Sequence, residues 1–283
     1  MAKAARKPDA SPKQLSGPQL YLGNKDAERG YFAVAAGEAA VTSIGDSEKK
    51  RPNEDSAAII PVNETHVVLA VADGVGGLAG ARKASNATVE SLRKSLRQAA
   101  TNPGQSLRTA ILDGIESANR SVMDSGTGGA STLALAEIGP DYIRSYHVGD
   151  SIVLICGQRG KLKLFTTPHS PVGFAMEAGL LNEKEALAHK ELNLIFNVIG
   201  SADMRIEVGS ELPLAPRDTI LLASDGLTDN VLQEEMIDAV RVGPLDKAIE
   251  RVTELALRRM RGEQLGKPSK PDDLTTLLYR RHP

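Results

Sequence analysis

This chain of 283 residues has few cysteines and few aromatic residues, and neither sign of charge is in large excess. The single cysteine, Cys156, excludes an intrachain disulfide and a thiolate zinc site, and its apolar surroundings in the sequence indicate a core residue. Tryptophan is absent and aromatics make up only 3% of the residues, which removes the usual stacking platforms for bases and sugars. The net charge of −2 disfavours polyanion binding. We therefore expect no nucleic-acid partner.

Long hydrophobic runs are missing as well. No apolar stretch approaches the roughly 20 residues of a membrane helix, and no apolar segment follows the basic N-terminus as it would in a secretory signal. The composition, 41% hydrophobic and 25% charged, is typical of a globular protein with a substantial core. Together with the cysteine count, these features predict a soluble, cytoplasmic protein without a membrane partner. We expect a monomer.

The chain divides into an N-terminal leader and one large domain. Residues 1–30 lack periodicity, which predicts a flexible or loosely docked leader, and residues 31–283 are expected to form a single domain. Apolar stripes predict helices at 81–100, 106–125 and 244–261. β-Rich runs predict about ten strands, at 40–44, 56–60, 67–72, 131–136, 142–148, 151–156, 162–166, 205–208, 219–223 and 274–279. The expected fold class is α+β, with sheets sandwiched between helices.

Two apolar segments of similar design each end in Asp-Gly. Residues 67–72 precede Asp73-Gly74, and residues 219–224 precede Asp225-Gly226. Taken alone, each pair is most often a turn, because Asp caps its own backbone and Gly accepts a positive φ.

Two further acidic groups change this interpretation. Glu54-Asp55 and Asp272-Asp273 each stand directly before or at the start of an expected strand. If the four strand tips meet, their carboxylates repel one another in a partly desolvated cleft unless cations neutralise them. Carboxylates, carbonyls and waters suit Mg²⁺ or Mn²⁺, whereas zinc normally recruits His or Cys, and the five histidines show no paired ligand spacing. Gly74 has no side chain, so its carbonyl can approach such an ion closely.

Six short motifs also occur in a characteristic order along the chain. They are Arg51 with Asn53-Glu54-Asp55, Asp73-Gly74-Val75-Gly76-Gly77, Gly129-Ala130-Ser131-Thr132, Val148-Gly149-Asp150-Ser151, Ser224-Asp225-Gly226-Leu227 and Asp272-Asp273-Leu274-Thr275. Together they resemble the metal-dependent serine/threonine protein phosphatases of the type 2C (PPM) family, in its bacterial style. The resemblance runs from about residue 41 to residue 279. It implies a four-layer α-β-β-α sandwich of two mainly antiparallel sheets, with metals between the tips of the sheets.

The resemblance implies a binuclear site. Two Mg²⁺ or Mn²⁺ ions would be held by Glu54, Asp55, Asp73, Gly74, Asp225 and Asp272. Asp73 would bridge the ions, the Gly74 carbonyl would bind one of them, and Glu54 and Asp55 would act mostly through coordinated waters. A hydroxide that bridges the ions would attack phosphorus directly, without a phosphoenzyme.

Three other residues have implied roles around this site. Arg51 would hold the substrate phosphate in its guanidinium fork, although alone it would be interpreted as a solvated residue beside Lys49 and Lys50. Asp150 and Asp229 would hold a weaker third ion, and a turn explains Asp150 equally well. The implied activity is hydrolysis of phosphoserine and phosphothreonine in proteins that a serine/threonine kinase has modified.

Residues 167–201 resemble the family's flap, with Asn182 as the expected N-cap of a short helix and Glu185 as its N3 residue. Three positions depart from the family pattern. Pro168 stands where many members have Asp and offers no side-chain ligand for a third ion, Val75 stands where His or Met is usual, and Ile152 replaces an Arg. These departures leave open a phosphatase-like regulatory or binding module with weak catalysis. A hydrolase for small phosphate esters also remains open.

Overall fold

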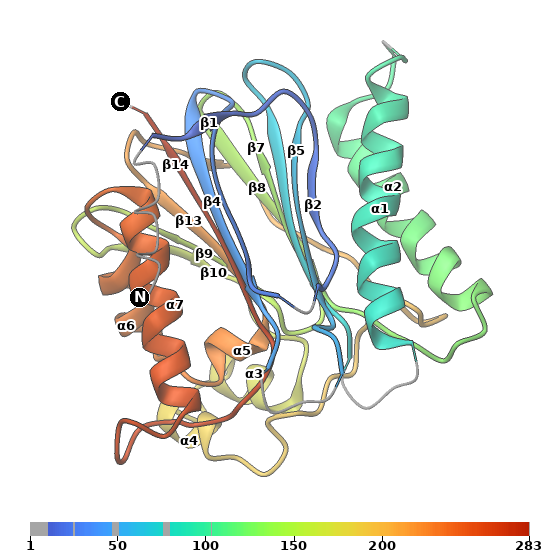
Figure 1. Ribbon diagram of the computed structural model, residues 1–283. Coiled ribbons are helices and arrows are strands. Elements are labelled where there is room, and N and C mark those ends of the chain that lie inside the picture. The colour runs from blue at the N-terminus through green and yellow to red at the C-terminus, as the bar shows by residue number, and fades with distance from the viewer. Residues whose placement is uncertain (1–10, 25, 47–50, 76–79, 103, 283) are drawn as a thin grey trace, which may run out of the picture.

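Two β-sheets pack face to face at the centre of the molecule, and helices cover both of their outer faces (Figure 1). The computed structural model describes residues 11–24, 26–46, 51–75, 80–102 and 104–282. The four layers therefore follow the order helix, sheet, sheet, helix, as the sequence motifs implied. No helix in these described ranges combines the length and apolar character needed to cross a membrane.

The first sheet has seven strands and is antiparallel except at one edge, where β1 pairs with β3 in parallel. In spatial order its strands are β1 (Lys13–Gln14), β3 (Glu28–Val34), β4 (Gly37–Ile44), β14 (Leu274–Arg281), β13 (Thr219–Ala223), β9 (Ile152–Cys156) and β10 (Leu162–Phe165). The central strands β13 and β14 are the two that lead into and out of acidic motifs. Their pairing brings Ala223 opposite Thr276 near those motifs.

The second sheet is antiparallel in every pair. In spatial order it contains β11 (Glu207–Val208), β8 (Tyr142–Val148), β7 (Leu133–Ile138), β6 (Val67–Asp73), β5 (Asp55–Pro61) and β2 (Gln19–Tyr21), and β12 (Leu212–Pro213) also pairs with β8. β5 begins beside the point where β6 ends, because Asp55 pairs with Asp73. The acidic residues at these two ends are therefore neighbours.

Seven helices occur in the described residues. They are α1 (Ala81–Ala99), α2 (Leu107–Asp124), α3 (Pro171–Glu177), α4 (Glu183–Leu187), α5 (Asp225–Thr228), α6 (Gln233–Val240) and α7 (Leu245–Met260). α1 and α2 pack on the second sheet, while α5, α6 and α7 pack on the first. The short helices α3 and α4 lie below the strand ends, near the acidic motifs (Figure 1).

Alternation along the strands produces three hydrophobic layers. In β6, Leu69 faces the core between the two sheets, whereas the next residue, Ala70, faces the core beneath α1 and α2. Successive side chains of a strand point to opposite faces, so a strand that is covered on both sides must be apolar throughout. This explains the uninterrupted apolar run at 67–72. The rigid core holds the acidic strand ends in fixed positions.

Most of the predicted elements are confirmed, with shifts of up to three residues at their ends. The helices expected at 81–100, 106–125 and 244–261 are α1, α2 and α7, and the strand expected at 205–208 is reduced to β11. The leader expected at residues 1–30 differs from the structure, because β1, β2 and the first part of β3 lie within it. β2 extends the second sheet by backbone hydrogen bonds to β5. Residues 1–10 lie outside the described part.

Candidate metal centre and phosphate site

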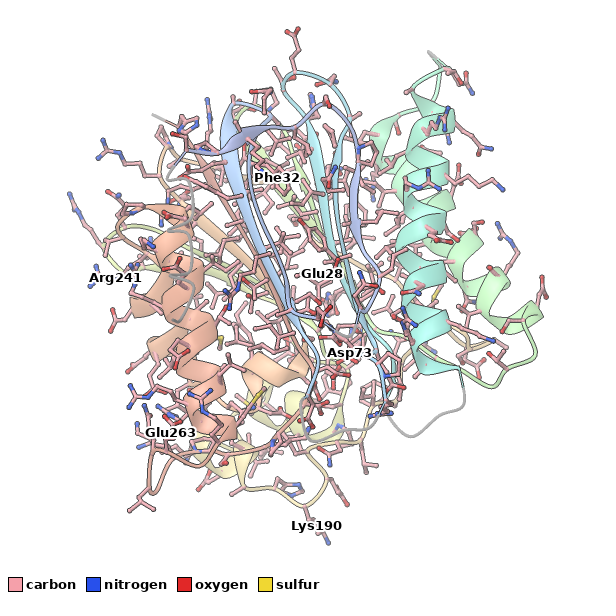
Figure 2. The ribbon with its side chains drawn as sticks, in the orientation of Figure 1. Glu28, Phe32, Asp73, Lys190, Arg241 and Glu263 are labelled. Carbon is pink, nitrogen blue, oxygen red and sulfur yellow. The ribbon has the colours of Figure 1, made fainter. Side chains whose placement is uncertain are left out.

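The acidic strand ends surround a cleft of about 200 Å³. Its acidic lining comes from Glu54, Asp73, Asp150, Asp225, Asp272 and Asp273, and its other lining residues include Arg51, Gly74, Val75, Thr132, Asn193, Ile195 and Lys270. The carboxylates come from both sheets, and Asp73 lies at the lower end of the strands in Figure 2. Residues separated by about 220 positions in the sequence thus share one small volume. Such a concentration of carboxylates favours bound cations.

Asp55 and Asp73 are direct cross-strand partners in β5 and β6. Asp55 is buried, and one of its carboxylate oxygens, Oδ2, accepts a hydrogen bond of 2.8 Å from Ser224 Oγ. Its other oxygen, Oδ1, is buried without a hydrogen-bond partner among the described residues. Burial and the charge of Asp273 raise the pKa of Asp55 to about 8. An orphaned carboxylate oxygen of this kind is suited to a bound water or cation.

The end of β6 is fixed by a threonine from the Gly-Ala-Ser-Thr motif. Thr132 Oγ1 accepts a hydrogen bond of 3.0 Å from the Asp73 amide, and the Thr132 amide donates to the Asp73 carbonyl at 2.8 Å. Thr132 Oγ1 also lies 2.6 Å from Ser151 Oγ, which links a second motif to the same point. Burial, followed by the charges of Asp55 and Asp225, raises the pKa of Asp73 well above its usual range. Thr132, supported by Ser151, therefore holds Asp73 in place.

Gly74 is required by close packing at the start of α1. A Cβ atom here would lie 2.5 Å from the Ala81 carbonyl oxygen and 2.9 Å from the Glu54 carbonyl oxygen. The Gly74 amide donates to that same Glu54 carbonyl at 3.1 Å. The backbone of the Asp-Gly motif therefore packs directly against the backbone of the Glu-Asp motif, as a close approach without a side chain permits. Gly76 and Gly77 of the motif lie outside the described residues.

Asp272 and Asp273 have different surroundings although they are adjacent. Asp273 is buried, and its two oxygens accept hydrogen bonds from the backbone amides of Asp46, at 2.8 Å, and Glu54, at 3.0 Å. Its carboxylate therefore ties the segments before β5 and after β4 to the start of β14. Asp272 is partly exposed to the cleft, and its Oδ1 accepts a hydrogen bond of 2.8 Å from the Asp273 amide. Of the pair, Asp272 is the one suited to hold a ligand.

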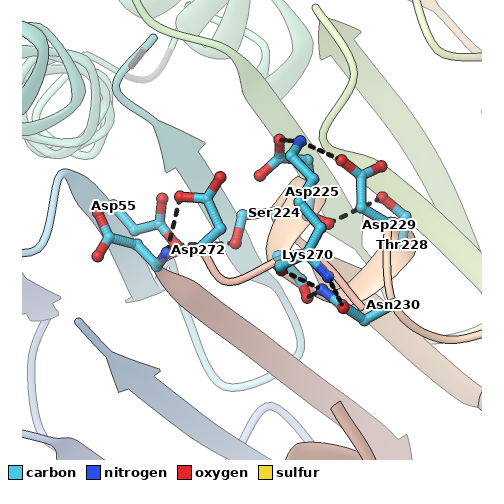
Figure 3. A network of polar contacts seen from close by, with 10 residues as sticks. Asp55, Ser224, Asp225, Thr228, Asp229, Asn230, Lys270 and Asp272 are labelled. Carbon is cyan, nitrogen blue, oxygen red and sulfur yellow. Dashed lines mark hydrogen bonds and ion pairs between the residues drawn. The ribbon is translucent and has the colours of Figure 1, made fainter. Parts of the chain in front are cut away.

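A lysine that the sequence motifs did not single out lies on the Asp225 side of the cleft. Lys270 Nζ is 3.2 Å from Asp225 Oδ2 and also forms an ion pair with Asp229 (Figure 3). Burial alone would lower the pKa of Lys270, but the charges of Asp225 and Asp229 raise it above its usual range. Burial and the charge of Asp225 raise the pKa of Asp229 to about 7 despite Lys270.

Asp150 completes this side of the cleft. Burial raises its pKa well above the usual range, and the charges of Asp225 and Asp229 add to this effect. Its Oδ1 atom is buried and has no hydrogen-bond partner among the described residues. Two orphaned carboxylate oxygens, on Asp55 and Asp150, thus belong to one cluster. The donor set is entirely oxygen, so the residues present fit Mg²⁺ or Mn²⁺ and not a soft metal.

Arg51 is a second cation in the described lining of the cleft. Its guanidinium forms an ion pair with Glu54, and about a third of its side chain is exposed. An arginine at the rim of an acidic cleft can bind a phosphate in two-pronged fashion once it turns from its carboxylate partner.

Two buried histidines and a glutamate form a second cluster with the spacing of a metal site. His147, His169 and Glu207 each present a ligand atom within 4.8 Å of the others, and the two imidazole rings stack at 4.3 Å. The hydrogen bonds argue against a metal here. His169 Nδ1 accepts from the Gly149 amide at 3.1 Å and lies 2.8 Å from Asn197 Nδ2, so Nε2 carries the proton and donates to Glu207 at 3.2 Å.

A histidine that ligates a metal through Nε2 normally donates an N–H from Nδ1, which these neighbours prevent. The cluster instead holds residues 167–201 in place. His169 and Asn197 join the two ends of residues 167–201 to Gly149, next to Asp150. The expected N-cap of α4 is confirmed, since Asn182 and Glu185 form a capping box.

The structure brings together most of the predicted site residues. Arg51, Glu54, Asp73, Gly74, Asp150, Asp225 and Asp272 line the cleft, Asp55 is buried directly behind it, and Asp229 is reached through Lys270. Lys270 was missed because it lies in a segment without periodicity, and its contacts with Asp225 and Asp229 span 45 and 41 residues. The supporting role of Asp273 was missed for the same reason.

Fold, cleft and motif order together define a phosphatase of the 2C class. The family model described as protein phosphatase 2C matches residues 44–268, so the chain belongs to that family. It is a serine/threonine protein phosphatase of type 2C, and its substrates are phosphoproteins.

Relatives and solved structures agree with this assignment. The chain is 29% identical over 208 residues to the protein phosphatase PhpP of Streptococcus pneumoniae, which covers 71% of this chain and 83% of that protein. It is 27% identical over 198 residues to the serine/threonine phosphatase stp of Listeria welshimeri, covering 67% of this chain and 77% of that protein. The solved serine/threonine phosphatase of S. agalactiae has a TM-score of 0.72 at 27% identity, covering 86% of this chain and 99% of that one.

Proposed function

We propose that this phosphatase works with two divalent cations, Mg²⁺ or Mn²⁺, held in the cleft between the two sheets. Asp73, the Gly74 carbonyl, Asp225 and Asp272 would hold the ions, with Glu54 and Asp55 supporting them. The observation that carries this proposal is the convergence of carboxylates from four strand ends on one cleft of about 200 Å³. A similar fold, the catalytic domain of the phosphatase PstP, was solved in complex with two manganese ions, at a TM-score of 0.69 and 23% identity.

When bound, the ions supply a water of lowered pKa and neutralise charge on the phosphate. The residues of the chain position the other partners of the reaction. Arg51 leaves Glu54 and binds two phosphate oxygens, which orients the phosphorus for in-line attack by water. The attacking water releases a proton to solvent and forms the new P–O bond, the P–O bond to the Ser or Thr oxygen breaks, and that oxygen takes a proton from solvent. Val75, which lines the cleft, has no proton to donate.

Direct attack by water is favoured because the described lining of the cleft contains no cysteine or histidine, and its carboxylates would be committed to the cations. Cys156 is buried in the core between the first sheet and its helices. The Thr132 hydroxyl is engaged by the Asp73 amide and Ser151. The described cysteine and hydroxyl side chains are therefore either outside the cleft or already engaged, which favours water as the attacking group.

Substrate class and cellular setting extend the proposal. We propose that the substrates carry phosphoserine or phosphothreonine placed by a serine/threonine kinase, and that the enzyme acts as a cytoplasmic monomer. The acidic cleft and the net charge of −2 disfavour nucleic acids. The departures at Ile152 and Pro168 do not favour a non-catalytic module, since Ile152 is a core residue and Pro168 packs beside Gly173 at the start of α3.

The test is hydrolysis of an aryl phosphate and a phosphothreonine peptide with Mn²⁺, with and without a chelator. We expect activity on both substrates, its loss with chelator, and a fall of about a hundredfold or more in Asp225→Asn. Asp203→Asn, an exposed residue outside the cleft, is the matched control and should keep full activity. Activity that survives both the chelator and Asp225→Asn would overturn the metal site.

The same assay separates the other functions. Binding of the phosphopeptide without turnover by the metal-loaded protein would favour a regulatory module. Turnover of the aryl phosphate and small phosphate esters, with none of the peptide, would favour a hydrolase for small esters.

A further inference from the structure

Positive charge is distributed unevenly around the acidic cleft. The cations among its described lining residues are Arg51 and Lys270, and Arg51 is paired with Glu54 at the rim. Lys270 instead reaches Asp225 and Asp229. No ion pair within 4.0 Å joins Asp55 or Asp73 to a lysine or arginine in the part of the chain that the structure describes. Among the described residues, Asp225 and Asp229 therefore share a lysine partner, whereas Asp55 and Asp73 have no lysine or arginine partner.

The backbone beneath Lys270 is held rigidly. Asn230 is fully buried, its Oδ1 accepts a hydrogen bond of 2.7 Å from the Lys270 amide, and its Nδ2 donates to the Lys270 carbonyl at 2.9 Å. The same Nδ2 donates to the Gly226 carbonyl at 2.9 Å, which joins Lys270 to the segment that carries Asp225 (Figure 3). Arg259, also buried, donates to the Asn230 carbonyl at 3.2 Å. The ammonium group of Lys270 therefore extends from a backbone segment that is held in place by hydrogen bonds.

We propose that Lys270 is a tethered cation that takes the place of a third divalent ion, so that this phosphatase holds the two proposed ions and no third ion between Asp225 and Asp229. The inference rests on the proposed two-ion site. An ammonium group supplies three donors, and Lys270 directs donors to two carboxylates at once. A divalent ion that entered between Asp225 and Asp229 would have to displace this group and leave it beside a second positive charge, which is strongly unfavourable in a partly buried site.

Asp150 has a defined place in this arrangement. Its Oδ1 atom is buried and has no hydrogen-bond partner among the described residues, and its carboxyl group interacts electrostatically with Asp225, Asp229 and Lys270. When Lys270 loses its charge, Asp150, Asp225 and Asp229 become an all-oxygen set with no protein cation, which suits a hard divalent ion. Removal of one lysine should therefore create a binding site instead of destroying one.

The experiment counts bound Mn²⁺ per chain by electron paramagnetic resonance of the free ion during titration, in the full-length protein. We expect two ions in the wild type and about one more in Lys270→Gln, with the extra ion lost again in Lys270→Gln/Asp229→Asn. Lys270→Arg keeps the charge and should bind two ions. Lys267→Gln is the matched control, because Lys267 pairs with Glu235 outside the cleft and its loss should leave two ions and the basal activity unchanged.

The outcomes distinguish this inference from the proposed function. If the wild type and Lys270→Gln bind the same number of ions, Lys270 is not a substitute for a metal, even when both are active. If the wild type binds no Mn²⁺, the two-ion site itself is wrong. Thermal unfolding with chelator checks that each variant is folded, and if Lys270→Gln is unfolded, Lys270→Met and Asp229→Asn are titrated in the same way. A third ion in Asp229→Asn alone would contradict the inference.

Discussion

Asp55 and Asp73 face each other where β5 begins and β6 ends, with Asp55 buried and one of its oxygens unpartnered among the described residues. Like charges directly opposite each other in a sheet are destabilising. In this pair the repulsion occurs in the desolvated wall of a cleft, where it is screened little. The pair is therefore costly in the metal-free protein and is an advantage only when cations are bound.

The metal-free protein should lose stability as the pH rises from about 4 to about 8. The pKa of Asp55 is about 8 in the folded chain and about 4 in an unfolded one, so folding favours the protonated carboxyl. This contribution to stability is complete below about pH 4 and is lost as the pH rises through the folded value. Measured with a chelator, Tm should fall by several degrees between pH 5 and pH 8.

Asp55→Asn supplies the matched control for this pH effect. The amide keeps a hydrogen-bond acceptor for Ser224 but carries no charge, so the chelated variant should have a flatter profile and a higher Tm at pH 8. Saturating Mn²⁺ should raise Tm at pH 8 in the wild type by more than in the variant. A wild-type Tm that rises steadily across this range in chelator would show that the carboxylates are not under mutual repulsion.

Arg51→Ala should weaken substrate binding more than it slows the chemical step. The guanidinium lies at the rim of the cleft beside Glu54, where it can contact the phosphate in the bound substrate. Loss of a charge-assisted contact corresponds to roughly a tenfold to hundredfold increase in KM, with a smaller change in kcat. Arg51→Lys, which keeps the charge but lacks the planar fork, should have an intermediate KM. An unchanged KM in Arg51→Ala would mean that Arg51 does not bind the phosphate.

The strands and the acidic cluster were predictable because their signals are local. β6 is apolar on both faces, which leaves an uninterrupted apolar run in the sequence. A carboxylate directly after such a run is therefore expected at the end of the strand, outside the core. α6 was missed although Met236, Ile237 and Val240 form an apolar stripe. Its eight residues are simply too few to stand out.

The parts that were missed depend on contacts between distant segments. β2 has three residues and is defined by backbone pairing with β5, which leaves no hydrophobic pattern. Lys270 lies in a polar stretch, and its role depends on the Asn230 side chain folding back on it. Neither residue type nor spacing marks a lysine for contact with carboxylates more than 40 positions away.

Gly226→Ala should damage the site through packing. A Cβ at Gly226 would overlap the Asp273 carbonyl oxygen, which belongs to backbone and cannot turn aside. The segment carrying Asp272 would have to shift, at a cost of about 1–3 kcal/mol, and Mn²⁺ affinity should fall together with Tm. Gly17→Ala is the control, because nothing lies within 4 Å of a Cβ at that position. If Gly226→Ala keeps wild-type Mn²⁺ affinity, the Asp-Gly turn and the Asp272 segment are not coupled.

The flap should select protein substrates through exposed apolar side chains beside the cleft. Asn193 and Ile195 line the cleft, and the next residue, Phe196, is 55% exposed, with its ring 5.0 Å from that of Phe174. Phe196→Ser should lower kcat/KM for a phosphoprotein by about fivefold, which corresponds to about 1 kcal/mol of lost apolar contact, and leave an aryl phosphate unaffected. Val242→Ser, between α6 and α7 and similarly exposed, is the control. An equal loss on both substrates would indicate that Phe196 supports the cleft and does not contact the protein substrate.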